Sequence, residues 1–151
     1  HYEVAPNRLE PYEVEMNDQL FKADAGKPMP DLLTLGMQRA LRLVQATMEY
    51  GAQKYEEHSW RDVPNAEARY FRACARHNQE RMMCMNGQGN ARPILEGADS
   101  ESGLPHIAHE VFNLLALMEL QIAEMPHDIY LRMLKFKQPP LDHKIEHPAV
   151  S

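Results

Sequence analysis

The sequence predicts an all-α fold, a bundle of about three to four main helices behind an extended N-terminal arm. After residue 31, apolar side chains recur at the spacing that places them on one face of a helix. A second helical stretch ends at Asn86-Gly87, a common C-terminal stop. A third is apolar along most of its length and is closed by Pro126. A chain of 151 residues without internal repeats fits one domain.

The first elements in chain order are the arm and the helix that follows it. Residues 1–31 show no sustained period and contain four prolines, so we expect an extended segment. A helix is expected over about 32–56, where apolar residues follow one another at helical spacing. They are Leu33, Met37, Leu41, Val44 and Met48. Asp31 precedes them and is suited to cap this helix.

The remaining elements follow from a break at Trp60 to Pro64 and from the later stop residues. We expect a helix over about 65–86, a loop over 87–102, a helix over about 105–124, a short helix over about 127–137 and a tail over 138–151. Ordered loops as long as this one are often functional. The predicted organisation is therefore an arm over 1–31, a helical domain over 32–137 and a C-terminal tail.

Charge and cysteine content limit the class of partner. The net charge of −6 disfavours electrostatic binding of nucleic acid, whose usual footprint is a basic patch. Nucleotides remain possible partners, because a divalent metal ion offsets the charge of a triphosphate. Cys74 and Cys84 lie about 15 Å apart along a helix axis, too far for a disulfide. Reduced cysteines and the lack of an apolar run of 18 residues lead us to expect a cytoplasmic protein without membrane contact.

The helix expected over 105–124 has an unusual composition. From Val111 to Met118 only Asn113 is polar. A helix that is apolar nearly all round is buried on most sides. In one small domain this implies a central place in the bundle or burial by another subunit.

A polar stripe in the first half of the same helix contrasts with that run. It consists of His106, His109, Glu110 and Asn113, whose spacings of three, four and seven residues place them on one face. Burying such groups without partners costs several kcal/mol. They must therefore be wet, hydrogen-bonded or bound to a metal ion. An exposed first helical turn is the alternative interpretation.

The helix expected over 65–86 offers a second polar pair, His77 and Glu80, with Arg76 beside it. Two facing helices that carry this pair and the pair His106 and His109 could assemble a cluster of four metal ligands. The alternative is that Glu80 pairs with a neighbouring arginine or with solvent.

Two further acidic positions are candidate ligands. Glu101 lies in the acidic stretch 96–103, whose carboxylates could bind a hard cation through oxygen. A solvated acidic loop is the alternative. Glu49 lies on the amphipathic helix over 32–56 and is a further candidate.

Residues around the end of that helix suit a nucleotide. Lys54 and Arg61 could hold phosphate, the arginine in bidentate fashion. Tyr55 and the single tryptophan, Trp60, could stack on a base, although Trp60 could equally anchor the core. The sequence contains no glycine-rich phosphate loop of the Walker type. The phosphates would therefore need cations rather than a backbone cradle.

Four groups of residues occur in order along the chain: Lys22, Asp24, Gly26, Lys27 and Pro28; the run Tyr50 to Tyr55 with Trp60 and Arg61; Arg76 and His77; and the run Glu101 to His109 with Asn113. In this order they resemble a family of phage-encoded dATP/dGTP diphosphohydrolases. The named members of that family are the MazZ proteins, relatives of the MazG-type all-α nucleotide pyrophosphohydrolases.

The resemblance implies hydrolysis of dGTP or dATP between the α- and β-phosphates, giving the monophosphate and pyrophosphate. In phages that replace adenine with 2-aminoadenine, this reaction feeds a dedicated purine pathway and helps to exclude adenine. The resemblance also implies a helical bundle completed by dimers or tetramers. MazG-type enzymes bind Mg²⁺ through paired carboxylates, whereas this chain has His77-x-x-Glu80 and His106-x-x-His109. Imidazole suits Mn²⁺ or another transition metal better than Mg²⁺.

The residues and the resemblance together assign candidate roles. Candidate metal ligands are His77, Glu80, Glu101, His106 and His109. Candidates for activating water are Glu49, Glu80 and Glu101. Candidates for holding the substrate are Lys22, Lys27, Lys54, Tyr55, Trp60, Arg61, Arg76 and Asn113.

Two rival functions are kept. One is a phosphohydrolase of the HD type that releases tripolyphosphate, but His127-Asp128 lies in the late short helix and Asp142-His143 in the tail. The other is a non-catalytic helical module that senses nucleotides or adapts one protein to another. The apolar helix would then be a partner face and the histidines structural.

Overall fold

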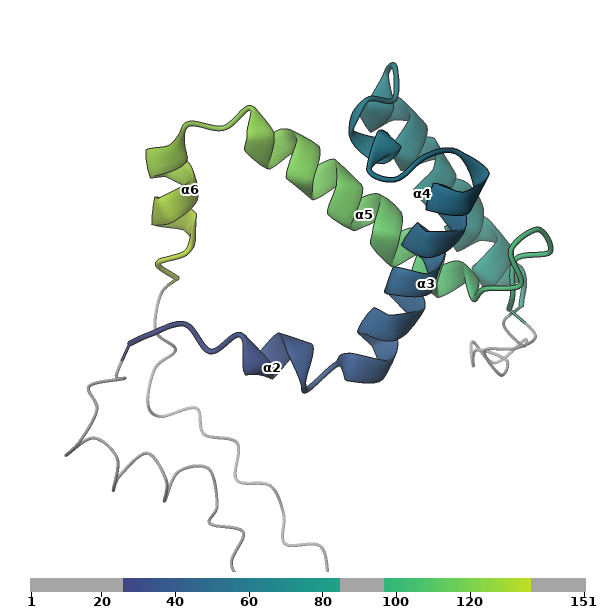
Figure 1. The fold of residues 1–151 in the computed structure, drawn as a ribbon, viewed down its shortest axis with the longest axis horizontal. Helices are drawn as coiled ribbons and strands as arrows, with labels where there is room; N and C mark the ends of the chain where they lie inside the picture. Colours follow the sequence, from purple (N-terminus) through teal and green to yellow (C-terminus); the bar gives the residue numbers. More distant parts are fainter. Residues whose placement is uncertain (1–25, 85–96, 137–151) are drawn as a thin grey trace, which may run out of the picture. The chain divides into compact units, whose positions relative to one another are not determined.

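The computed structural model describes residues 26–84 and 97–136, and in these two ranges the chain is helical (Figure 1). No residue of the described ranges belongs to a β-strand, although an isolated bridge joins Ala98 and Pro105. The all-α prediction is confirmed. None of the described helices is long and apolar enough to cross a membrane. The predicted stop at Asn86-Gly87 and the predicted tail lie outside the described residues.

The chain divides into two compact units, residues 1–38 and 39–151. The described part of the first unit contains the short helix α2 (Asp31–Thr34). A turn covers residues 35–37, and α3 (Gln38–Lys54) begins after it. The prediction of one continuous helix over 32–56 is therefore wrong. The predicted domain boundaries at residues 31 and 137 stay predictions.

Gly36 accounts for the break between α2 and α3. Its N–H donates to the Asp31 carbonyl at 3.2 Å, one residue further back than the step of an α-helix. A Cβ on Gly36 would lie 2.4 Å from the Leu32 carbonyl oxygen, so only glycine fits this backbone path. Asp31 is also not the cap that we predicted. Pro30 occupies the N-cap position, and Asp31 is the first helical residue.

The second unit contains the rest of the helices. After α3 these are the 3₁₀-helix η1 (Ser59–Arg61), α4 (Ala66–Met83), α5 (His106–Ala123) and α6 (His127–Met133). Left-handed backbone at His58 (φ 61°) and Asn65 (φ 53°) redirects the chain just before η1 and α4. The second and third predicted helices are present with ends close to those expected. The last helix ends at Met133, earlier than the predicted residue 137.

Helix α5 packs along α4 with its polar side inward. Its buried residues are His106, Ala108, His109, Glu110, Asn113 and Ala116. The polar stripe predicted from the sequence is therefore the packed face of the helix. The alternative interpretation, an exposed first turn, is wrong for these side chains because each is less than a tenth exposed.

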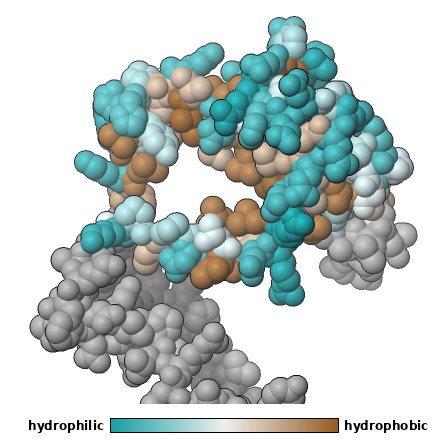
Figure 2. Space-filling view, viewed as in Figure 1, coloured by the Kyte–Doolittle hydropathy of each residue, from teal (hydrophilic) through white to brown (hydrophobic). Residues whose placement is uncertain are grey.

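The apolar side of α5 faces away from this contact. Leu114 is 53% exposed and Met118 52% exposed, and Val111 and Leu115 are also exposed. Figure 2 shows hydrophobic side chains at the surface of the molecule among hydrophilic ones. A central place for this helix within one chain is thus not observed among the described residues. Burial by another subunit, the second expectation, stays a prediction.

A buried ion pair fixes the contact between α4 and α5. The Arg81 guanidinium donates to both carboxylate oxygens of Glu110, at 2.5 and 3.1 Å, and the Asn78 amide donates to the same carboxylate at 2.8 Å. The Cys74 thiol contacts the Glu110 carbonyl, and burial raises the pKa of that thiol. Burial alone would raise the pKa of Glu110, but the bonds from Arg81 and Asn78 hold it below the ordinary value. Glu110 is therefore a charged group inside the helix contact.

Removing Arg81 should destabilise the fold more than removing an exposed arginine of the same helix. Arg81→Ala leaves the Glu110 carboxylate, 9% exposed, without its cation. We expect a loss of about 3 kcal/mol in the free energy of unfolding, the cost of breaking a buried pair from one side. Urea unfolding measures this loss, with Arg72→Ala on the exposed side of α4 as the matched control. Equal effects of the two substitutions would contradict this account of the contact.

Candidate functional site

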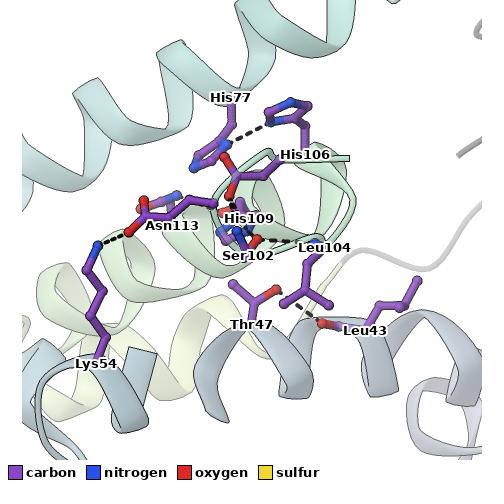
Figure 3. Close-up of polar contacts among 11 residues, drawn as sticks. Leu43, Thr47, Lys54, His77, Ser102, Leu104, His106, His109 and Asn113 are labelled. Atoms are coloured by element: carbon purple, nitrogen blue, oxygen red, sulfur yellow. Dashed lines mark hydrogen bonds and ion pairs between the residues drawn. The ribbon is translucent and has the colours of Figure 1, made fainter. Parts of the chain in front are cut away.

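Two histidines from different helices meet where α4 and α5 pack together. His77 reaches from α4 toward His106 at the start of α5, and their Nδ1 atoms lie 2.9 Å apart (Figure 3). His106 is buried, whereas His77 is half-buried. Without a metal ion, one of these nitrogens must carry a proton that it donates to the other. With both nitrogens deprotonated, the same two atoms could bind one cation.

A carboxylate from the preceding loop completes a group of three. Asp99, His77 and His106 each offer one ligand atom, and these atoms all lie within 4.8 Å of one another. The Asp99 side chain is 19% exposed. Two imidazoles and one carboxylate are a donor set that transition metals favour. Asp99 belongs to the acidic stretch 96–103 whose carboxylates were predicted to be able to bind a cation, but Glu101 was the acid named as the ligand.

The loop that carries Asp99 is closed by its own hydrogen bonds. The Asp99 N–H donates to the Leu104 carbonyl, and the Gly103 N–H donates to the Asp99 carbonyl, both at 2.8 Å. Gly103 has φ +71°, a left-handed conformation that favours glycine. The His106 N–H donates to the Gly97 carbonyl at 3.0 Å, which joins the loop to the start of α5. The loop therefore presents Asp99 at a fixed place beside α5.

His109 lies one helical turn after His106 and adopts a different role. Its ring stacks on that of His77, with centroids 4.3 Å apart and an interplanar angle of 8°. Its Nε2 atom lies 2.8 Å from the Ser102 hydroxyl and 4.0 Å from Asp99 Oδ2. His109 therefore borders the three-residue group but is not one of its members.

The protonation states of these groups suit a cation. Burial lowers the pKa of His77 and of His109 below the ordinary histidine value. Burial would raise the pKa of Asp99, but hydrogen bonds from Ser102 and the nearby His109 lower it. Neutral imidazole and ionised carboxylate are the forms that bind metal. The two Nδ1 atoms, 2.9 Å apart, would be the imidazole atoms that hold such an ion.

A second polar cluster joins the end of α3 to the Asp99 loop. The Lys54 ammonium donates to the Glu101 carboxylate, and this ion pair is largely exposed. Lys54, followed by the neighbouring Tyr50 hydroxyl, lowers the pKa of Glu101. Burial and the Glu101 carboxylate raise the pKa of Tyr50. Two residues predicted for different roles, a phosphate ligand and a metal ligand, are thus paired with each other.

The other two predicted carboxylates lie outside the group. Glu49 is exposed on α3 and accepts hydrogen bonds from Gln45 at 2.7 Å and from Arg42 at 3.1 Å. These two bonds, that from Gln45 first, lower its pKa. Glu80 is exposed on α4. Neither joins the metal-binding group found among the described residues.

The predicted substrate-binding residues are spread over several elements. Arg76 is exposed on α4 beside His77. Tyr55 is 74% exposed after α3, and its ring lies under the Lys54 ammonium at 5.5 Å. Trp60 is half-buried in η1 with the Arg61 guanidinium 5.1 Å from its ring.

Some of the remaining candidate residues lie in the described part of the chain, and others do not. Asn113 is buried, and its amide donates to the His109 carbonyl at 2.7 Å. Lys27 belongs to the first compact unit, and Lys22 lies outside the described residues. Of the two HD-type pairs considered earlier, His127-Asp128 is exposed on α6, and Asp142-His143 also lies outside the described residues.

Sequence reasoning missed Asp99 and Ser102. The pattern Asp-x-x-Ser-Gly before Pro105 contains a usable signal, because an aspartate that accepts from the N–H three residues later forms a local turn. That turn is present, with Ser102 N–H donating to Asp99 Oδ2 at 2.8 Å. Its position directly before the histidine helix would have favoured Asp99 over the other acids of the loop.

The fold and the site define a helical protein with a partly buried group of two histidines and one carboxylate that suits a divalent cation. The model of the family described as "dATP/dGTP diphosphohydrolase, N-terminal" matches residues 17–128, and the chain belongs to this family. It is accordingly a nucleoside triphosphate diphosphohydrolase, as the resemblance implied. Comparisons with curated proteins and with solved structures found no match.

Proposed function

We propose that this chain hydrolyses dGTP or dATP between the α- and β-phosphates in a metal-dependent reaction that releases the monophosphate and pyrophosphate. The observation that carries the proposal is the convergence of His77, Asp99 and His106 at the contact of α4 with the loop before α5. Family membership supports the substrate class. The donor set favours Mn²⁺ or another transition metal over Mg²⁺.

One set of residues would bind the cation, and another set would bind the triphosphate. His77, Asp99 and His106 would hold the ion, which when bound polarises the phosphate and lowers the pKa of a water molecule. Arg76 stands beside His77 with an exposed side chain and would meet the phosphates. Lys54 would exchange Glu101 for a phosphate oxygen, because a multiply charged triphosphate competes with a single carboxylate.

Glu101 is the carboxylate best placed to act on water. It lies two residues from Asp99 in the same closed loop. Lys54 is the main cause that lowers its pKa, so once Lys54 turns to the substrate the carboxylate becomes both available and a stronger base. Glu101 is itself exposed and outside the metal-binding group, as Glu49 and Glu80 are, but those two lie on helices away from the Asp99 loop and are weaker candidates.

Other parts of the substrate would meet residues around the end of α3 and the arm. Tyr55 is exposed and adjacent to Lys54, so its ring could stack on a purine while the lysine meets phosphate. Trp60 and Arg61 are a second aromatic and cationic pair nearby in the sequence. The expectation from the sequence that Lys22 and Lys27 bind the phosphates stays a prediction. Asn113 would act indirectly, through the His109 carbonyl to which it donates.

The wider setting follows from the resemblance. We propose that the enzyme serves the synthesis of 2-aminoadenine DNA in a phage, and that it acts in the cytoplasm of the host. We also propose that it works as a homodimer or homotetramer. The exposed apolar side of α5 supports this, because contiguous exposed apolar patches commonly mark protein contacts. The net charge of −6 supports the expectation that nucleic acid is not a partner.

The function is tested by incubating the full chain with each deoxynucleoside triphosphate and with Mg²⁺ or Mn²⁺. We expect dGMP or dAMP with pyrophosphate, and faster turnover with Mn²⁺ because two of the ligands are imidazoles. Release of tripolyphosphate would instead identify an HD-type triphosphohydrolase. No turnover with any divalent metal would favour a non-catalytic module.

The ligand assignment is tested in the same assay by Asp99→Asn and His106→Ala. Each substitution should lower kcat/KM by about 100-fold or more, since even residues that only support metal ligands are worth 10–100-fold. Asp128→Asn on the exposed part of α6 is the matched control and should stay within about twofold of the wild type. Full activity in Asp99→Asn would refute the assignment.

Three substitutions, Glu101→Gln, Glu49→Gln and Glu80→Gln, test which carboxylate acts as the general base. Glu101→Gln should lower kcat by about 100-fold or more, in the range of a lost general base. The other two should stay within about threefold, because both side chains are exposed on helices and neither belongs to the loop that carries Asp99. Steady-state kinetics at saturating Mn²⁺ measures the series. A larger loss in Glu49→Gln or Glu80→Gln than in Glu101→Gln would move the base to that helix.

The oligomer is tested by Leu114→Glu, which places a charge on the exposed apolar side of α5. Light scattering coupled to size exclusion should show more than one chain for the wild type and a single chain of 17.4 kDa for the variant. Gln121→Glu, an exposed polar position on the same helix, should leave the mass unchanged. A monomeric wild type would show that this face does not bind a second copy.

A further inference from the structure

Ser102 makes polar contacts with two different parts of the candidate metal centre. Its backbone N–H donates to Asp99 Oδ2 at 2.8 Å, and its hydroxyl lies 2.8 Å from His109 Nε2. The Leu104 N–H donates to the same hydroxyl oxygen at 3.2 Å. Figure 3 shows Ser102 between Leu104 and His109. The side chain therefore ties the Asp99 loop to the helix that carries the histidines.

We propose that Ser102 is a positioning residue of the metal centre, which orients Asp99 through its backbone N–H and holds His109 against His77 through its hydroxyl. The inference rests on the proposed metal-dependent function. It concerns a residue that neither the sequence pattern nor the family assigned a role.

The first step of the argument concerns Asp99. An aspartate in a loop can adopt many orientations, so it binds a metal ion well only if hydrogen bonds restrain both its backbone and its carboxylate. The backbone of Asp99 is held by Leu104 and Gly103, and Ser102 is the residue that binds its carboxylate. Because Oδ2 accepts from Ser102, the carboxylate is oriented before any ion arrives. Such preorganisation commonly determines how tightly a site binds its metal.

The second step concerns His109. Its Nε2 lies 4.0 Å from Asp99 Oδ2, at the border of the three-residue group. The Ser102 hydroxyl engages this nitrogen at hydrogen-bond distance. Stacking on His77 fixes the plane of the ring. The His109 ring therefore packs against the His77 ring and limits its movement, and the Ser102 hydroxyl holds His109 in that position.

Metal binding by the full chain, stripped of metal with EDTA, tests this role without relying on turnover. Ser102→Ala keeps the backbone N–H that donates to Asp99 but removes the hydroxyl that engages His109 and accepts from Leu104. Isothermal titration with Mn²⁺ should therefore give a dissociation constant about 10-fold higher for Ser102→Ala than for the wild type, because His109 no longer supports the ring of the ligand His77. Ser102→Thr keeps the hydroxyl and should stay within about threefold of the wild type. Ser100→Ala makes the same change at an exposed position of the same loop and should match the wild type.

Thermal unfolding of the metal-free chains separates positioning from folding. The positioning role predicts that Ser102→Ala and Ser100→Ala unfold at the same temperature without metal, and that only Ser102→Ala loses part of the stabilisation by Mn²⁺. Mn²⁺ affinity of Ser102→Ala equal to that of Ser100→Ala would overturn the inference. An equal loss of stability with and without metal would also overturn it, since Ser102 would then be structural. Failure of the wild type to bind Mn²⁺ would instead refute the metal-dependent function.

Discussion

The packing of a polar helix face against α4 is the constraint from which the rest of the unit follows. Burying His106, His109, Glu110 and Asn113 without partners would cost several kcal/mol for each group. Among the described residues, no buried side-chain nitrogen or oxygen lacks a hydrogen-bond partner. The contact is therefore stable only in the register that brings every partner together. In a helix pair joined by apolar side chains, small shifts would cost much less.

The loop before α5 depends on that register and in turn completes the site. It is anchored to the first turn of α5 by the bond from His106 to Gly97, so it moves with the helix. Asp99 can therefore lie near His77 only if α4 packs against α5 in one particular axial register. The pair of Arg81 and Glu110, one turn further along both helices, supplies that registration. A buried charge pair is best understood as a device for specificity of this kind rather than as a source of net stability.

Helical periodicity identified α4, α5 and the polar stripe correctly, but it missed the break at Gly36 and could not give the rotation of α4. His77 and Glu80 share a face at a spacing of three residues, which suggested a joint ligand pair. The side of α4 that meets α5 instead runs through His77, Asn78 and Arg81, so Glu80 points to solvent. Only the partner helix decides between these two neighbouring faces. Asp99 was missed for a related reason, because loop hydrogen bonds rather than spacing bring it to the site.

Helix α5 has a polar inner face and an apolar outer face, and the part of the chain that the structure describes leaves the outer face uncovered. The inner face carries His106, His109 and Glu110, whereas Leu114, Leu115 and Met118 on the outer face are exposed. In an isolated domain the hydrophobic effect would favour the reverse orientation. The buried hydrogen bonds and the pair with Arg81 oppose that reversal, because turning the helix would bury unpaired charge elsewhere or leave Glu110 without its cation. Burying the outer face in a protein contact would reduce this conflict without disturbing the buried polar face, since the two faces lie on opposite sides of α5.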